Sequence, residues 1–193
     1  HVFKSNGTFN ITSSPADSDI EILVVAGGGG GSTKLKGGAG GGAGGLIYES
    51  NIDMSAGQYN ITVGSGGAVS ANGQNSSIIG SDVSYTAIGG GAGGDGNEAG
   101  VSGGSGGGGS STTSNDGRPP GAGVPGQGYH GGFAINSNYD QGGGGGGAGG
   151  PGGDGQKIGG AVTRGGIAGT GREILIANGA SVNFGDVNHS NWY

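Results

Sequence analysis

Short runs in which apolar and polar residues alternate stand apart along this chain, each bounded by glycine-rich sequence. Phe9 and Ile11 alternate with polar neighbours in the run 8–12, and the run 58–63 keeps the same period of two. That period predicts strands with one buried face. The run 19–26 becomes apolar on both faces towards its end, which predicts a central strand. Further strands are expected at 2–4, 46–48, 83–88, 172–176 and 181–184.

No segment of the sequence has the pattern of an α-helix. Ala, Leu, Glu and Lys never gather over three turns, and each helical glycine costs about 1 kcal/mol relative to alanine. We therefore expect an all-β fold, a small β-sandwich or jelly-roll-like framework with long insertions. The framework strands are expected around 2–26, 46–63, 75–88 and 172–184, and the glycine insertions at 27–45, 89–128 and 142–171. Residues 1–193 would form a single glycine-rich module, part of a longer chain.

The glycine insertions carry many of their other residues at a spacing of three. Three such series are Ala92, Asp95, Glu98 and Val101; Ala148, Pro151, Asp154 and Lys157; and Ala161, Arg164, Ile167 and Thr170. Three residues make one turn of a polyproline-II-type helix, which has no internal hydrogen bonds and must therefore bond to neighbours. We expect polyglycine-II helices packed as a bundle, with a flexible linker as the alternative. Collagen is excluded, because it needs unbroken Gly-X-Y triplets rich in proline and this chain has only 5 Pro.

The composition explains why the glycines need such an arrangement. Glycine supplies 58 of 193 residues, and only 30% of residues are hydrophobic and 10% charged. An ordinary globular domain is about 45–50% apolar and about 25% charged, so a conventional core cannot order the whole chain. A net charge of −6 with seven scattered Lys and Arg argues against nucleic-acid binding. No long apolar run predicts membrane insertion. The absence of cysteine is consistent with an exported protein and equally with other compartments.

Three motifs that could carry chemistry are better explained structurally. The strand 19–26 runs into Gly-rich 27–31 followed by Ser-Thr-Lys, but a phosphate loop needs Gly-Lys-Ser/Thr and a following helix. Asp95 and Asp154 sit in glycine turns without the tandem repeat of calcium-binding nonapeptides. Carboxylate oxygens are nevertheless good calcium ligands, so calcium is the one cofactor left open, and no other is expected. The three histidines, His1, His130 and His189, have no spacing that suggests a triad or a metal site, and we expect no catalytic residue.

Two sets of residues are candidates for surface roles. Five Asn residues lie in N-x-Ser/Thr glycosylation motifs: Asn6, Asn10, Asn60, Asn75 and Asn188. Strand alternation places Asn10 and Asn60 on outward faces, where a glycan is tolerated. The aromatic residues outside the framework strands are Tyr129, Phe133, Tyr139, Trp192 and Tyr193. They either form a surface that stacks against sugars, fill gaps between glycine helices, or form a contact between subunits.

Several stretches follow one another in the order of a known domain. They are residues 7–9, 20–26 running into 27–31, 41–46, 55–67, 75–77 and 89–94. In this order the chain resembles the glycine-rich domain of phage tail fibres and secreted microbial proteins. It is more distantly similar to the glycine-rich ectodomain of anaplastic lymphoma kinase, whose cysteines are missing here. The resemblance implies a strand framework with polyglycine-II insertions and a structural or receptor-binding role.

These observations together predict a non-enzymatic subunit or module of an extracellular fibre, either a viral tail fibre or a cell-surface filament. Its main partner would be itself, in a homo-oligomer or helical fibre, at an extracellular location or on a virion surface. The alternative is an adhesin module that recognises a host-surface glycan or protein. An ice-binding protein is a third class, although the sequence lacks a regular threonine array.

Overall fold

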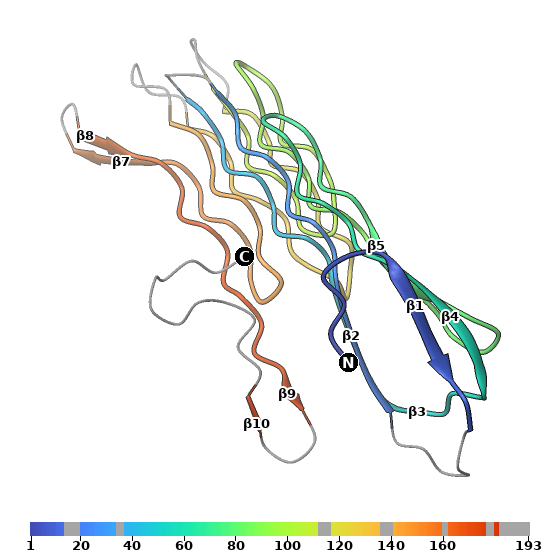
Figure 1. Cartoon of the computed structure of the whole chain (residues 1–193). Coiled ribbons are helices and arrows are strands. Elements are labelled where there is room, and N and C mark those ends of the chain that lie inside the picture. Colours follow the sequence, from blue (N-terminus) through green and yellow to red (C-terminus); the bar gives the residue numbers. More distant parts are fainter. Residues whose placement is uncertain are drawn as a thin grey trace.

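The computed structural model describes residues 1–13, 20–33, 37–111, 117–135, 141–159, 162–176 and 180–181. In these residues all regular secondary structure is β, with neither an α-helix nor a 3₁₀-helix, so the all-β prediction is confirmed. The strands of the framework gather at one end of the molecule, and the glycine-rich segments extend from it side by side (Figure 1).

Six strands form two antiparallel sheets at the framework end. The larger sheet has the order β1 (Gly7–Ile11), β4 (Gly57–Thr62), β5 (Ser76–Ile79) and β6 (Ser84–Ala87). The smaller sheet pairs β2 (Ile20–Val25) with β3 (Leu46–Ile52). The alternating runs at 8–12 and 58–63 therefore correspond to β1 and β4, which pair with Phe9 opposite Tyr59.

Two strand predictions are wrong in detail. Residues 2–4 form no strand, and the Phe3 ring instead packs edge-on against Phe9 with ring centroids 6.4 Å apart. β2 is not a central strand, because among the described residues its strand partner is β3 alone. Its apolar second face is only partly covered, and Val25 is 45% exposed.

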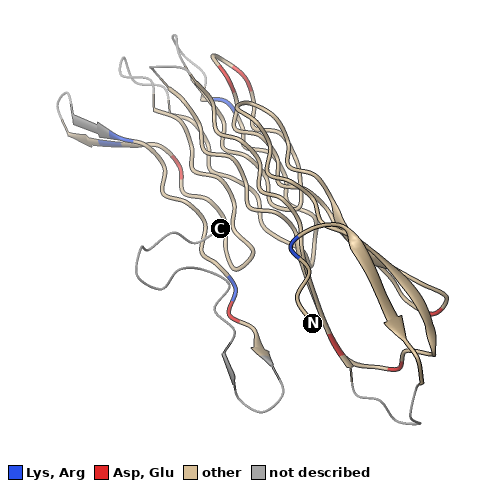
Figure 2. Ribbon diagram, viewed as in Figure 1, with Lys and Arg blue, Asp and Glu red and all other residues tan. Residues whose placement is uncertain are grey.

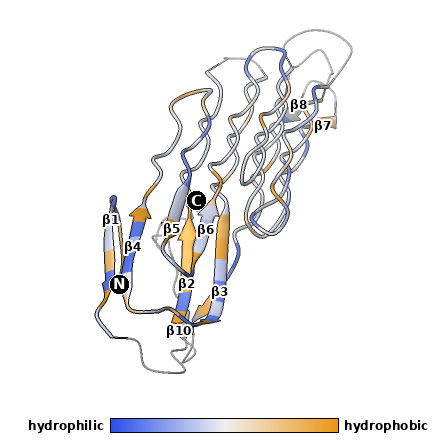
Figure 3. Cartoon of the chain, turned by 90° about the vertical axis from the view of Figure 1, so that its right-hand side faces the viewer, coloured by the Kyte–Doolittle hydropathy of each residue, from blue (hydrophilic) through white to orange (hydrophobic). Residues whose placement is uncertain are grey.

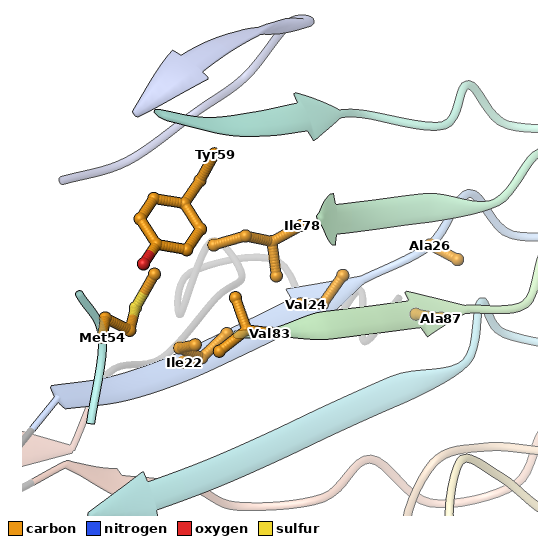
Figure 4. Packing of buried hydrophobic residues seen from close by; sticks show 8 residues of the cluster. All are labelled: Ile22, Val24, Ala26, Met54, Tyr59, Ile78, Val83 and Ala87. Carbon is orange, nitrogen blue, oxygen red and sulfur yellow. The ribbon is translucent and has the colours of Figure 1, made fainter. Parts of the chain in front are cut away.

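The two sheets pack face to face over one small hydrophobic core. Ile22 and Val24 of β2 and Ala26, which directly follows it, alternate inward and meet side chains of the larger sheet and its loops (Figure 4). The remaining core residues are Met54, Tyr59, Ile78, Val83 and Ala87. Fixing the backbone costs roughly 1–2 kcal/mol per residue, so a core of this size cannot order the long glycine segments as well. Figure 3 shows the strongly hydrophobic residues concentrated on the framework strands.

Tyr59 has the largest fully buried side chain in the described part of the chain, and its hydroxyl is hydrogen-bonded to a carboxylate. The Tyr59 hydroxyl donates to Asp82 Oδ1 at 2.7 Å, and the Ser55 backbone N–H donates to Asp82 Oδ2 at 2.7 Å. These two donors, the Tyr59 hydroxyl first, lower the pKa of Asp82 to about 2. The β5–β6 turn that carries Asp82 is thereby attached to β4.

The glycine-rich segments are held together by backbone hydrogen bonds that repeat every three residues. The centre is the segment 103–111, in which every residue is buried. Ser105 and Gly108 donate to the segment 37–45, Gly106 and Gly109 donate to 128–135, and Gly107 and Ser110 donate to 98–101. The carbonyls of 105–109 accept in the same rotation from 89–94, 142–147 and 117–122. Six segments therefore surround the central one.

Glycine is required here because the backbones approach too closely for a side chain. A Cβ on Gly106 or Gly107 would lie 1.9 Å from the carbonyl oxygen of a neighbouring segment. Among the described glycines, φ is positive only at Gly37, Gly96, Gly126 and Gly159. Most glycines therefore adopt backbone angles open to other residues, and it is the space around them that excludes a side chain.

One part of the predicted three-residue series is instead a hairpin. Lys157 and Arg164 lie in β7 (Gln156–Gly159) and β8 (Val162–Arg164), which pair with each other. The residues 156–158 and 162–164 lack glycine and include β-branched residues, which favours strands. The strand predicted at 172–176 is reduced to β9 (Leu175–Ile176), which pairs with β10 (Ala180–Ser181). Residues 182–184 lie outside the described part.

Two adjacent glycines provide a matched test of the close approach. Gly27→Ala would place its Cβ 2.0 Å from the Ser65 carbonyl oxygen, whereas at Gly28 the nearest atom is 3.6 Å away. We expect Gly27→Ala to lower the free energy of unfolding by about 1–3 kcal/mol, as overpacking does. Gly28→Ala should be neutral or stabilising by about 0.4–1 kcal/mol, through the unfolded state. Chemical denaturation of both variants checks this, and equal destabilisation would contradict it.

The Tyr59–Asp82 contact predicts a pH dependence of stability. Because the folded pKa of Asp82 is about 2 and its ordinary value is 3.8, the contact stabilises the fold fully above about pH 4. This stabilisation is lost as the pH falls towards 2. Asp82→Asn should lower the melting temperature at neutral pH, and its difference from wild type should shrink between pH 4 and 2. The exposed Asp53→Asn is the control, and a pH-independent difference at Asp82 would contradict the assignment.

Candidate functional site

A tight turn at residues 124–127 begins the candidate site. Gln127 N–H donates to the Val124 carbonyl at 3.0 Å, with Pro125 and Gly126 between them. Pro125 occupies the position where its fixed φ is favourable, and Gly126 has φ of +82°, so this is a type II turn. The Pro-Gly pair is itself a turn signal in the sequence, and it is the feature from which this turn could be predicted.

Gln127 fastens this turn to the framework. Its Oε1 accepts from the Ile88 N–H at 2.8 Å, and its Nε2 donates to the Thr86 carbonyl at 3.2 Å. Its own carbonyl accepts from the Leu46 N–H at 3.0 Å. The turn is thus anchored beside both sheets, at the framework end of the bundle.

Backbone contacts bring two other segments to the same place. Tyr129 N–H donates to the Gly147 carbonyl at 3.1 Å, beside the chain reversal at 147–150. Gly149 N–H donates to the Thr170 carbonyl at 2.8 Å, and a Cβ at Gly149 would lie 2.1 Å from the Gly171 carbonyl oxygen. This close packing places Arg172, which follows directly, beside the reversal.

The three segments enclose an open hollow of about 560 Å³. Small residues form much of its wall, and four larger side chains, those of Pro125, Tyr129, His130 and Arg172, also line it. Tyr129 is 48% exposed, and His130 and Arg172 are exposed as well. Arg172 is the single residue with a permanent charge among those that line the hollow. A volume of this size is typical of small-ligand sites, which span about 300–1,000 Å³.

His130 is held by its own neighbour. Its Nδ1 lies 2.7 Å from the Gly131 carbonyl oxygen, so Nδ1 carries a proton that it donates there. In the neutral ring, Nε2 is then left as an acceptor. No sequence pattern links His130 with Arg172, because they lie 42 positions apart and only the tertiary packing brings them together.

Of the five aromatic candidates, Tyr129 and Phe133 lie in the described part of the chain, where they occupy different settings. Phe133 is 49% exposed on the same segment as Tyr129, but it does not line the hollow. Its backbone N–H instead donates to Asp154 Oδ1 at 2.7 Å. Tyr139, Trp192 and Tyr193 lie outside the described residues.

The glycosylation motifs occupy different settings. Asn10 and Asn60 are exposed on β1 and β4, and whether they carry glycans stays a prediction. Asn6 Oδ1 accepts from the Val63 N–H at 2.9 Å, and Asn75 Oδ1 accepts from the Gly89 N–H at 2.8 Å, so both side chains have structural contacts. Asn188 lies outside the described residues.

The glycine run at 27–31 takes part in the backbone hydrogen bonding between segments. The N–H groups of Gly27, Gly29 and Gly30 already donate to carbonyls of neighbouring glycine-rich segments. Elsewhere in the described part, no three His, Cys, Asp or Glu residues gather as metal ligands. Asp95 has a buried Oδ1 that makes no hydrogen bond there, whereas Asp154 holds Phe133. No helix in this part of the chain is long and apolar enough to cross a membrane.

Charged residues are sparse along the glycine segments and lie mostly near their ends and on the strands (Figure 2).

In a comparison with known proteins, the family model for a glycine-rich domain matches residues 4–191. Among curated proteins and solved structures, nothing matches the chain. This family match covers both the framework and the glycine segments, including the residues around the hollow. This chain belongs to the glycine-rich domain family.

Proposed function

We propose that this chain is a non-enzymatic structural module of an extracellular fibre, in which polyglycine-II helices are bundled on a small β-sandwich, jelly-roll-like framework. The observation that carries the proposal is the buried segment 103–111 with its six hydrogen-bonded neighbours. It supplies structural order without a side-chain core, as a fibre component needs.

The hydrogen-bond pattern supports polyglycine-II rather than β conformation. In a strand, successive backbone groups point to two sides, whereas here successive donors at 105, 106 and 107 reach three different segments. The donor at 108 then returns to the segment that 105 reached. That rotation is the three-residue turn of a polyproline-II-type helix. The negative φ of nearly all described glycines agrees with it.

Such a bundle would be stiff in every transverse direction. Each neighbour is joined by a row of backbone bonds, each worth about 0.5–1.5 kcal/mol net. A sheet has such rows on two sides only, whereas the central segment has them on six. A rod of this kind transmits force and holds its ends at a fixed separation, which suits a spacer within a fibre.

The outer segments support self-association. Along 64–69, a Cβ at Gly64 or Gly67 would meet a neighbouring backbone at 2.1 Å, but Gly66 has no atom closer than 3.8 Å. Val69 on the same segment is 59% exposed. An open edge of backbone groups, with 10% charged residues to oppose contact, offers a surface for a second copy. An extracellular or virion-surface location fits the resemblance to phage tail fibres and the absence of cysteine.

A second candidate is an adhesin module that recognises a host-surface glycan or protein. The half-exposed Tyr129 beside an anchored hollow favours it. The two functions are compatible, because the bundle uses the backbone groups of its segments, whereas the hollow presents exposed side chains such as those of Tyr129 and Arg172.

Amide hydrogen exchange tests the bundle. The N–H groups of residues 104–110 should be among the slowest to exchange, together with those of Tyr59 and its neighbours in β4, because they open only with the bundle. NMR of the uniformly labelled chain measures them individually. Glycine amides that exchange at the rate of an unfolded peptide would refute the bundle.

Sedimentation tests the fibre. We expect the native chain to form an oligomer or a filament whose subunit contact exceeds about 1,000 Å². Sedimentation velocity at micromolar concentration, with electron microscopy of the same sample, measures this. A dispersed monomer would reject the fibre and leave the adhesin module as the better account.

A further inference from the structure

The hollow beside Tyr129 combines a cationic group with apolar ring faces on an otherwise acidic molecule. The chain has a net charge of −6, yet Arg172 is the one permanently charged residue among those that line this site. Its neighbour Glu173 is exposed but does not line the hollow. An anion is therefore the ligand that this site favours over the rest of the surface.

The walls favour a ring-shaped ligand. Tyr129 and Pro125 present flat, partly apolar surfaces, and the exposed face of an aromatic ring packs well against the C–H face of a sugar. The small residues Gly123, Gly126 and Ala148 leave the space open. Arg172 carries the planar guanidinium that binds a carboxylate through two parallel hydrogen bonds. His130 adds an acceptor for a hydroxyl, because its Nδ1–H is already donated to Gly131.

The site is also prepared in advance. The type II turn fixes Pro125, three hydrogen bonds of Gln127 tie that turn to the framework, and backbone bonds hold Tyr129. A preformed site avoids much of the ordering cost of binding. We propose that this hollow binds an acidic monosaccharide unit of a glycan, with the carboxylate on Arg172 and the sugar ring on Tyr129.

This inference deepens the second function proposed above and rests on it, whereas the fibre does not depend on it. The probes are N-acetylneuraminic acid and glucuronic acid, with N-acetylglucosamine and glucose as neutral counterparts. Isothermal titration of the full chain should give millimolar binding of one or both acids and much weaker binding of the neutral sugars.

Variants assign the binding to the hollow. Arg172→Gln and Tyr129→Ala should each weaken binding of the acid roughly tenfold or more, and Arg172→Lys should restore part of the loss. Tyr129→Phe should keep most of the affinity, because it retains the ring. The matched controls are Phe133→Ala, an aromatic side chain of similar exposure on the same segment, and Arg164→Gln on β8. Both should bind as wild type does.

Three results would overturn the proposal. They are no binding of either acid, equal affinity for acidic and neutral sugars, or equal losses in the controls. Unfolding midpoints of all variants show whether a loss reflects damage to the fold, and Tyr129→Phe with Arg172→Lys keeps the test valid if Tyr129→Ala unfolds. Failure here with intact oligomers in sedimentation would reject the site alone, whereas dispersed monomers that still bind the acids would reject only the fibre.

Discussion

The structure depends on hydrogen bonds between backbones that lie too close together for any side chain. Gly106 and Gly107 show the constraint, since a single added carbon on either would lie 1.9 Å from a neighbouring carbonyl oxygen. Most proteins bury apolar side chains and accept the backbone spacing that results. Here the close spacing of the backbones is the primary constraint, and it requires glycine at the contact positions. The closely packed glycines of these segments are therefore as much a packing requirement as the leucines of an ordinary core.

The β framework supplies what the glycine segments lack. A segment without side chains has little to define which neighbour it pairs with, because every backbone presents the same groups. The core around Tyr59 and Ile78 fixes the strands, and the strands fix both ends of the glycine segments between β2 and β3 and between β4 and β5, and the start of the segment after β6. Gln127 extends this control into the bundle through its bonds to Ile88 and Thr86. Side-chain contacts such as those of Gln127 lie near the framework end of the glycine segments, whereas backbone hydrogen bonds join the segments along their length.

The sequence predicts strands where apolar and polar side chains alternate. It does not predict the contacts that depend on backbone packing between glycines. Phe9 and Ile11 predicted β1 because a buried face leaves a period of two. Lys157 and Arg164 fitted a series of three and were assigned to glycine helices, although the β-branched residues around them form a hairpin. Tyr129 was predictable as a surface aromatic residue, because it lies outside the framework strands in a chain poor in apolar residues. Arg172 could not be placed beside it, because that proximity depends on the contact between Gly149 and Gly171, and glycines carry no pattern of their own.

The three-residue rotation of hydrogen bonds constrains how the length of a glycine segment can change. The donors at 105 and 108 reach one neighbour, and those at 106 and 109 reach another. Inserting or deleting one residue would turn every following donor by a third of a circle, towards the wrong neighbour. Inserting or deleting three would shift the segment along its axis and keep each partner. Rods of this kind can therefore lengthen or shorten over evolution in steps of three residues, with the turns between them free to vary.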